Sequence, residues 1–153
     1  MINITIEKAK ENDSIKLNEL FSKLLEDDRL HYDENIKENL TMNSFFEKRI
    51  NLENNIILVA KNDDNIIGYI YGYIRNDNKI KKELEANIES LYIEEIYRNN
   101  KVGTRLINEF INIATLKNVK YIFIENKYSN KIASSLYNKL GFNNFIETKR
   151  KEI

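Results

Sequence analysis

Alternating apolar and polar positions mark the strands of this chain, and apolar positions three and four residues apart mark its helices. Ile2, Ile4 and Ile6 alternate with polar residues and predict a first strand. Further strands are predicted over residues 55–61, 66–75, 86–93 and 120–125. Helices are predicted from Asp13 or Ser14 onward, and over residues 36–51, 101–117 and 130–140.

Two polar segments separate these elements. Asn62-Asp63-Asp64-Asn65 is a hairpin-turn signal between two strands, and the polar stretch 27–35 separates the first two helices. The order strand, two helices, three strands, helix, strand, helix predicts an α+β fold, with helices flanking a mixed central sheet. The residues after Phe142 are enough for one more strand. Because no linker or repeat interrupts the pattern, we expect residues 1–153 to form a single domain.

Composition narrows the function classes. The 153 residues include 24 basic and 24 acidic side chains, so a formal net charge of zero gives no reason to expect a nucleic-acid partner. The absence of cysteine excludes a disulfide framework, a thiolate metal site and a cysteine nucleophile. No metal-ligand spacing occurs, so no metal is expected. The chain has no run of 18 apolar residues and begins without a basic, apolar leader, so we expect no membrane contact and a cytoplasmic location.

The turn Arg98-Asn99-Asn100-Lys101-Val102-Gly103-Thr104 is a candidate anion site, because it leads from a predicted strand into a predicted helix. The first turn of a helix presents unpaired backbone N–H groups and the positive end of the helix dipole. A phosphate or carboxylate would be stabilised there. This segment therefore predicts chemistry as well as fold.

Two motifs in order resemble the GNAT family of acyl-CoA-dependent N-acetyltransferases. The family pattern Arg/Gln-x-x-Gly-x-Gly/Ala fits Arg98 and Gly103, whereas Lys101 stands where the first glycine belongs. The later pattern Asn-x-x-Ala-x-x-Leu-Tyr-x-Lys-x-Gly-Phe is matched in full from Asn130 to Phe142. The resemblance is tight over residues 86–142. It implies a GNAT-like fold and acetyl-CoA as co-substrate.

The resemblance implies cofactor contacts in three places. Backbone N–H groups of the turn would bind the pyrophosphate, with Gly103 allowing close approach. Arg98 and Lys101 would add charged contacts, or else they are solvated surface charges. Backbone groups of a splayed strand would face the pantetheine and the thioester oxygen, and the start of the last helix would add a further contact. The residues concerned are Leu91, Tyr92, Ile93, Arg98, Asn99, Asn100, Lys101, Val102, Gly103, Thr104, Asn130 and Ala133.

Tyr137 and Glu89 are the candidate catalytic residues that the resemblance implies. Tyr137 would protonate the departing thiolate as general acid, because a phenol stays protonated at neutral pH; alternatively it is a packed aromatic of an amphipathic helix. Glu89 precedes the splayed strand, where small-amine acetyltransferases of this family carry a glutamate. It would bind an ammonium group and accept its proton. Glu94 and Glu95 are competing bases, and Glu89 could instead be a strand-surface residue.

Several residues are expected near the acceptor. Carboxylates at 26–28 and 33–34 suit a cationic acceptor, or they are a solvated helix end. Tyr69, Tyr71 and Tyr73 share one face of a strand and could line a pocket through cation–π contacts or cover the sheet. His31, the only histidine, is expected to be a surface loop residue.

The C-terminus is shorter than in the family, whose members usually end in a two-stranded hairpin. One sheet edge is therefore expected to be short, or to be completed by a second subunit in a homodimer. Taken together, the sequence predicts an acetyl-CoA-dependent N-acetyltransferase acting by direct attack on a primary amine, most readily a small cationic amine of polyamine or aminoglycoside type. The alternatives are an acetyltransferase for peptide N-termini or lysine, and a non-catalytic coenzyme A-binding relative.

Overall fold

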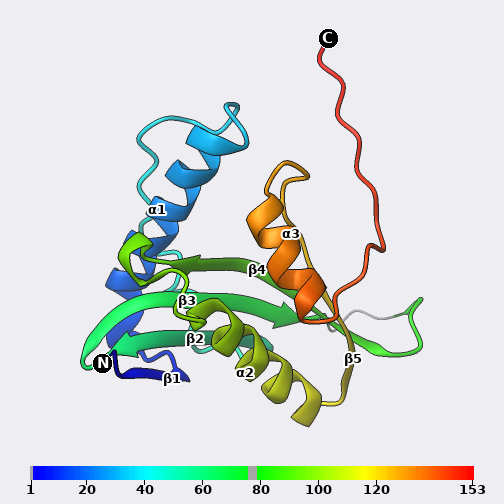
Figure 1. The fold of residues 1–153 in the computed structure, drawn as a ribbon. Helices are drawn as coiled ribbons and strands as arrows, with labels where there is room; N and C mark the ends of the chain where they lie inside the picture. Colours follow the sequence, from blue (N-terminus) through cyan, green and yellow to red (C-terminus); the bar gives the residue numbers. More distant parts are fainter. Residues whose placement is uncertain (1, 76–78) are drawn as a thin grey trace.

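A five-stranded sheet forms the centre of the molecule in the computed structural model, which describes residues 2–75 and 79–153 (Figure 1). The strands follow the chain in their order across the sheet. They are β1 (Ile4–Lys8), β2 (Asn55–Asn62), β3 (Asn65–Ile74), β4 (Leu84–Ile93) and β5 (Val119–Ile124). Neighbouring strands are antiparallel except for β4 and β5, which run parallel. The sheet is therefore mixed, as the sequence predicts.

Helices cover both faces of this sheet (Figure 1). They are α1 (Ser14–His31), α2 (Val102–Leu116) and α3 (Lys131–Lys139), with short 3-10 turns η1 (Glu11–Asp13) and η2 (Glu95–Tyr97). One core lies between the sheet and α2, where Phe110 is fully buried, and α3 packs against its edge through Leu136. A second core lies on the α1 face, where Leu17 and Tyr69 are fully buried. These contacts confirm the α+β prediction.

The predicted helix over 36–51 is wrong. No helix is found over 32–54, and Asn39 and Ser44 have positive φ angles of 54° and 56°, which interrupt any helical path. The segment is held by α1 instead, because Asn18 Oδ1 accepts a hydrogen bond from the Phe46 N–H at 3.1 Å. Phe46 is fully buried among aromatic rings of the sheet. The apolar residues of the segment 32–54 are therefore buried because the segment docks onto α1, and not because it forms the apolar face of a helix.

Two further boundaries differ from the prediction. The polar stretch 27–35 does not end the first helix where expected, since α1 continues to His31 and is supported by the Glu26–Arg29 ion pair at 2.7 Å. His31 is exposed, as expected, but it is the last residue of the helix and not a loop residue. No strand forms over 143–153, so the additional strand for which this segment is long enough is not present; the segment runs as an extended tail (Figure 1).

The remaining boundaries agree with the prediction to within one or two residues. The hairpin turn lies at Asp63-Asp64, with Asn62 paired to Asn65 and Asp63 at φ 52°. Within the described residues, no helix is long and apolar enough to cross a membrane.

Candidate active site

Strand β4 separates from β5 halfway along its length. The last pair is Ile88 with Ile124, whereas β4 remains paired with β3 as far as Ile93. The edge of β4 over 89–93 that faces β5 therefore has no strand partner among the described residues. Leu91, Tyr92 and Ile93 lie on this stretch, which is the place where the sequence predicts contacts with pantetheine. Free backbone groups at such an edge can bind the amides of an extended ligand.

A β-bulge at Glu89 coincides with this separation. Tyr71 pairs with Ser90 and Gly72 pairs with Ile88, so Glu89 is the extra residue on β4. Gly72 permits the bulge, because a Cβ atom there would lie 2.2 Å from the Asn87 carbonyl oxygen. After the bulge, Tyr92 packs in the α1-side core and Leu91 against the α2-side core. The bulge changes the direction of the side chains on β4 at the point where pairing with β5 ends. Bulges of this kind are common beside active sites.

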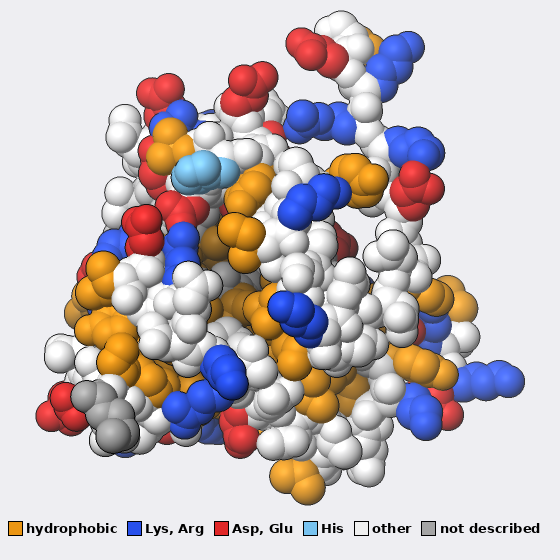
Figure 2. Space-filling view, viewed as in Figure 1, with side chains coloured by type: hydrophobic (Ala, Val, Ile, Leu, Met, Phe, Trp, Pro, Cys, Tyr) orange, Lys and Arg blue, Asp and Glu red, His pale blue; other side chains and the backbone are white. Residues whose placement is uncertain are grey.

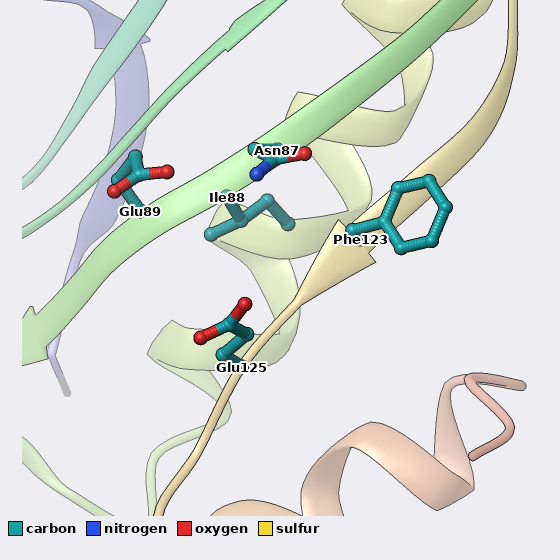
Figure 3. Close-up of a pocket in the computed structure, with 5 residues that line it drawn as sticks. All are labelled: Asn87, Ile88, Glu89, Phe123 and Glu125. Carbon is teal, nitrogen blue, oxygen red and sulfur yellow. The ribbon is translucent and has the colours of Figure 1, made fainter. Parts of the chain in front are cut away.

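Glu89 lines a cavity of about 220 Å³ on the sheet (Figure 3). Its other lining residues are Asn87, Ile88, Phe123 and Glu125. Phe123 and Glu125 are not among the candidates that the sequence predicts, where Glu125 is only the end of a predicted strand. The Phe145 ring lies 5.5 Å from the Phe123 ring, so the C-terminal segment contacts the wall of this cavity.

The N-terminus of α2 has no side-chain cap. The residue before the helix, Lys101, has φ 60° and ψ 16°, a left-handed conformation that favours glycine. Lys101 thus has the backbone conformation for which the family pattern carries a glycine at this position. Gly103 lies in the first turn, and a Cβ atom there would be 3.5 Å from Ile93 Cδ1 and Leu136 Cδ2. The open helix end therefore adjoins both β4 and α3.

Arg98 is exposed, but contacts with neighbouring groups fix its side chain. Its Nε donates to the Ile93 carbonyl oxygen at 2.9 Å, and one terminal nitrogen is 2.8 Å from Asp27 Oδ2. Its guanidinium also lies 5.4 Å from the Tyr92 ring centroid. Burial, the largest single influence, lowers the pKa of Arg98. The hydrogen bond to the Asp27 carboxylate and the nearby negative charges outweigh it together, so the pKa is raised overall. Arg98 therefore ties α1 to the end of β4. Asn100 similarly donates to the Tyr97 carbonyl and closes the turn.

Helix α3 has a side-chain cap and carries Tyr137. Asn130 Oδ1 accepts a hydrogen bond from the Ala133 N–H at 3.1 Å. Burial raises the pKa of the Tyr137 hydroxyl to about 12, and the negative charge of Asp28 on α1 adds to the rise. The Tyr137 ring packs edge-on against Phe142, 6.1 Å between centroids. The Tyr137 phenol therefore remains protonated near neutral pH while its ring is fixed by packing.

Asp28 stands apart from the other carboxylates of the acidic stretch. Asp27 pairs with Arg98, and Asp33 pairs with Lys127 at 3.0 Å and with Arg150 at 3.1 Å. No ion pair of Asp28 is found among the described residues, and its pKa is raised chiefly by burial. Figure 2 shows a hollow with hydrophobic side chains at its floor between α1 and α3.

The three tyrosines of β3 cover the sheet. Tyr69 and Tyr71 are buried in the α1-side core, and Tyr73 is packed against it. None of them lines the cavity beside Glu89. Among residues 2–75 and 79–153, no group of three His, Cys, Asp or Glu side chains is arranged to hold a metal ion.

Comparisons with known proteins identify the family and the fold of the chain. A family model described as the acetyltransferase (GNAT) family matches residues 17–142. No curated protein matches the chain. Among solved structures, the tetramutant of protein BH1408 from Bacillus halodurans superposes with a TM-score of 0.86 at 19% identity, covering 97% of this chain and 99% of that one.

Two of the similar structures are aminoglycoside acetyltransferases from uncultured soil metagenomic samples. One, meta-AAC0020, was solved with sisomicin and has a TM-score of 0.76 at 18% identity, covering 98% of this chain and 97% of that one. The other, HMB0005, has a TM-score of 0.76 at 17% identity, covering 99% of each chain. At these identities the structures show a common fold. The family match extends over most of the chain, and the chain belongs to the GNAT family of acetyltransferases.

Proposed function

We propose that this protein transfers an acetyl group from acetyl-CoA to a primary amine of a small cationic molecule. The observation that carries the proposal is the meeting of two features: the unpaired edge of β4 after Ile88 and the uncapped N-terminus of α2. The first suits an extended chain bearing amides, and the second suits a pyrophosphate. Coenzyme A combines both groups in one molecule.

The residues present fit this donor. Backbone N–H groups of Val102, Gly103 and Thr104 would hold the pyrophosphate, because no side chain caps them. The ammonium of Lys101 can add a charge, whereas Arg98 is already bound to Asp27. Backbone groups of 91–93 would hold the pantetheine arm. When bound, acetyl-CoA supplies the activated acetyl group for the transfer.

Tyr137 acts as general acid in this proposal. Burial keeps its pKa at about 12, so the hydroxyl carries a proton at neutral pH. It is positioned on α3, whose residue Leu136 lies within contact distance of where a Gly103 Cβ would be. Tyr137 thus lies on the helix that borders the proposed coenzyme site, from which its phenol would donate a proton to a departing thiolate.

Glu89 receives the amine and its proton. Of the competing bases, Glu94 is neutralised by Lys16 at 3.1 Å and Lys23 at 3.3 Å. Glu95 lies in η2, after the end of β4. Glu89 is exposed in its cavity, and no ion pair of its carboxylate is found in the described part of the chain. A free carboxylate can hold an ammonium group and accept its proton, directly or through water.

The acceptor class follows from the charge of this region. Glu89 and Asp28 are carboxylates without ion pairs among the described residues, and they favour a cation. Two of the similar structures are described as aminoglycoside acetyltransferases, and aminoglycosides carry several amino groups. A small cationic amine is therefore preferred to a peptide.

An amine panel tests the proposal directly. Purified protein is incubated with acetyl-CoA and diamines, aminoglycosides or lysine peptides, and release of the coenzyme thiol is measured. Turnover with small amines, and little with peptides, is expected. Stabilisation by acetyl-CoA without thiol release for any amine would instead establish a non-catalytic coenzyme A-binding protein.

Substitution of Glu89 by Gln tests its role. The variant should lower kcat/KM for the best amine and leave acetyl-CoA binding unchanged, because Gln keeps the shape but loses charge and basicity. The deficit relative to wild type should shrink from about pH 7 to about pH 10, as the amine loses its proton without help. A deficit that stays constant over this range would assign Glu89 a structural role.

A further inference from the structure

The cavity beside Glu89 is lined by groups that attract cations. Glu89 and Glu125 contribute carboxylates, Asn87 an amide oxygen and Phe123 an aromatic face, and no Lys or Arg is among the lining residues (Figure 3). The two carboxylates come from different strands. Glu89 is the bulged residue of β4, and Glu125 directly follows β5, one residue beyond the last β4–β5 pair. The cavity thus lies where the two strands separate.

Both carboxylates lack a cation of their own. No ion pair or hydrogen bond of Glu89 or Glu125 side chains is found within residues 2–75 and 79–153. The nearby cations are paired with other carboxylates: Lys127 with Asp33 at 3.0 Å, and Arg75 with Glu85 at 3.3 Å, with the Arg75 guanidinium also over the Phe123 ring. A carboxylate pair that faces one cavity without counter-charges is stabilised by a cationic ligand.

A third lining group, Asn87, supports the same kind of ligand. The Oδ1 atom of Asn87 is buried and has no hydrogen-bond partner among the described residues. Buried polar atoms in native proteins are almost always paired, so an orphan acceptor beside a cavity indicates a donor supplied by a ligand. The Phe123 ring is already occupied, since the Arg75 guanidinium lies 5.5 Å from its centroid, so Phe123 serves as a wall of the cavity. An ammonium group satisfies each of these requirements.

The size of the cavity limits the ligand. At about 220 Å³ it is smaller than the roughly 300–1,000 Å³ typical of sites for drug-sized molecules. A linear aliphatic diamine has the small cross-section and the two charges that the cavity requires. An aminoglycoside has several rings and would extend beyond it.

We propose that Glu125 is a specificity-determining residue, which binds the second ammonium group of a linear diamine while Glu89 faces the reacting amine. This inference rests on the proposed acetyl transfer and adds the substrate class to it. Binding of the remote ammonium places the reacting nitrogen on the Glu89 side of the cavity. Glu125 contributes to substrate binding and takes no part in proton transfer.

The test compares two amines of equal chain length, diaminobutane and butylamine, in wild type and in Glu125→Gln. Wild type should prefer the diamine. In the variant, kcat/KM for diaminobutane should fall about tenfold, through KM, because one charge-assisted contact is lost. The value for butylamine should change less than twofold. Glu125→Asp, which retains the charge, should recover part of the diamine preference.

Glu109→Gln is the matched control, since it removes one carboxylate from α2, on the opposite face of the sheet. It should leave both kcat/KM values unchanged. Equal losses for the two amines in Glu125→Gln, or no loss for the diamine, would overturn the role of Glu125 while leaving acetyl transfer intact. Absence of thiol release by wild type with every amine would overturn the proposed function and this inference together.

Discussion

Helices α2 and α3 both carry candidate site residues, but their N-termini are built differently. Helix α3 begins at Asn130, whose side chain accepts a hydrogen bond from the Ala133 N–H. Helix α2 begins after Lys101, which has a left-handed backbone and supplies no side-chain cap. α2 is also the longer helix, with 15 residues against nine. Its free N–H groups and dipole are therefore available to an external anion.

This difference separates two tasks. A cap stabilises a helix by satisfying orphan donors, and an uncapped end retains those donors for a ligand. The capped helix α3 carries the packed Tyr137, whose position requires a rigid support. The uncapped helix α2 adjoins the β4 edge. We therefore expect substitutions on α3 to affect turnover or stability, and those at the start of α2 to affect coenzyme binding.

The largest expected effect is that of Tyr137→Phe on turnover. The variant should lower kcat on the order of 100-fold, because it removes the proton donor while the ring keeps its contact with Phe142. Acetyl-CoA affinity should stay within a few-fold, as measured by calorimetry. Since the pKa of Tyr137 is about 12, wild-type turnover should not decline through loss of this proton as pH rises to about 10. Unchanged turnover in the variant would show that water or another group protonates the thiolate.

The next effect concerns binding at α2. Acetyl-CoA should raise the melting temperature of the wild type, because it binds only the folded state. Gly103→Asp should abolish this rise by placing a negative charge at the helix end that is proposed to hold pyrophosphate. Gly103→Ala is the control: its Cβ makes ordinary contacts at 3.5 Å, so the rise should persist. Equal thermal shifts in the Asp and Ala variants would show that the turn does not take part in acetyl-CoA binding.

A smaller effect is expected when the cap of α3 is removed. Asn130→Ala should lower the free energy of unfolding by about 1 kcal/mol, because the Ala133 N–H loses its acceptor. Asn130→Asp retains an acceptor and should stay close to wild type. Urea denaturation measures both. If Ala and Asp variants are equally stable, the hydrogen bond to Ala133 does not contribute to helix stability.

The smallest effect is expected at Lys101. Lys101→Gly should raise the free energy of unfolding by up to about 1 kcal/mol, since glycine adopts the left-handed conformation without steric cost. Lys101→Ala keeps the unfavourable conformation and should give no such gain. Denaturation of the pair isolates the backbone effect from loss of the ammonium. A gain in both variants would attribute it to charge and not to φ.

Much of the fold follows from local sequence patterns. The apolar periodicity of α2 and the apolar runs of β2 and β3 predict these elements to within one or two residues, because α2 buries one face against the sheet and the two strands are buried on both faces. The segment 36–51 shows where this reasoning fails. Its apolar residues Phe45, Phe46 and Ile50 fit a helical period, but α1 offers side-chain hydrogen bonds to its backbone, and docking replaces helix formation.

The candidate site, like the fold, could be predicted only in part from the sequence. The sequence by itself determined the candidates Glu89, Tyr137 and Gly103 and the likeness to GNAT acetyltransferases, because these depend on residue type and spacing along the chain. Only the tertiary structure decided that β4 leaves β5 after Ile88, that Arg98 is bound by Asp27, and that Glu125 shares a cavity with Glu89. Each of these depends on contacts between residues far apart in the chain, and local periodicity carries no information about which distant residues meet.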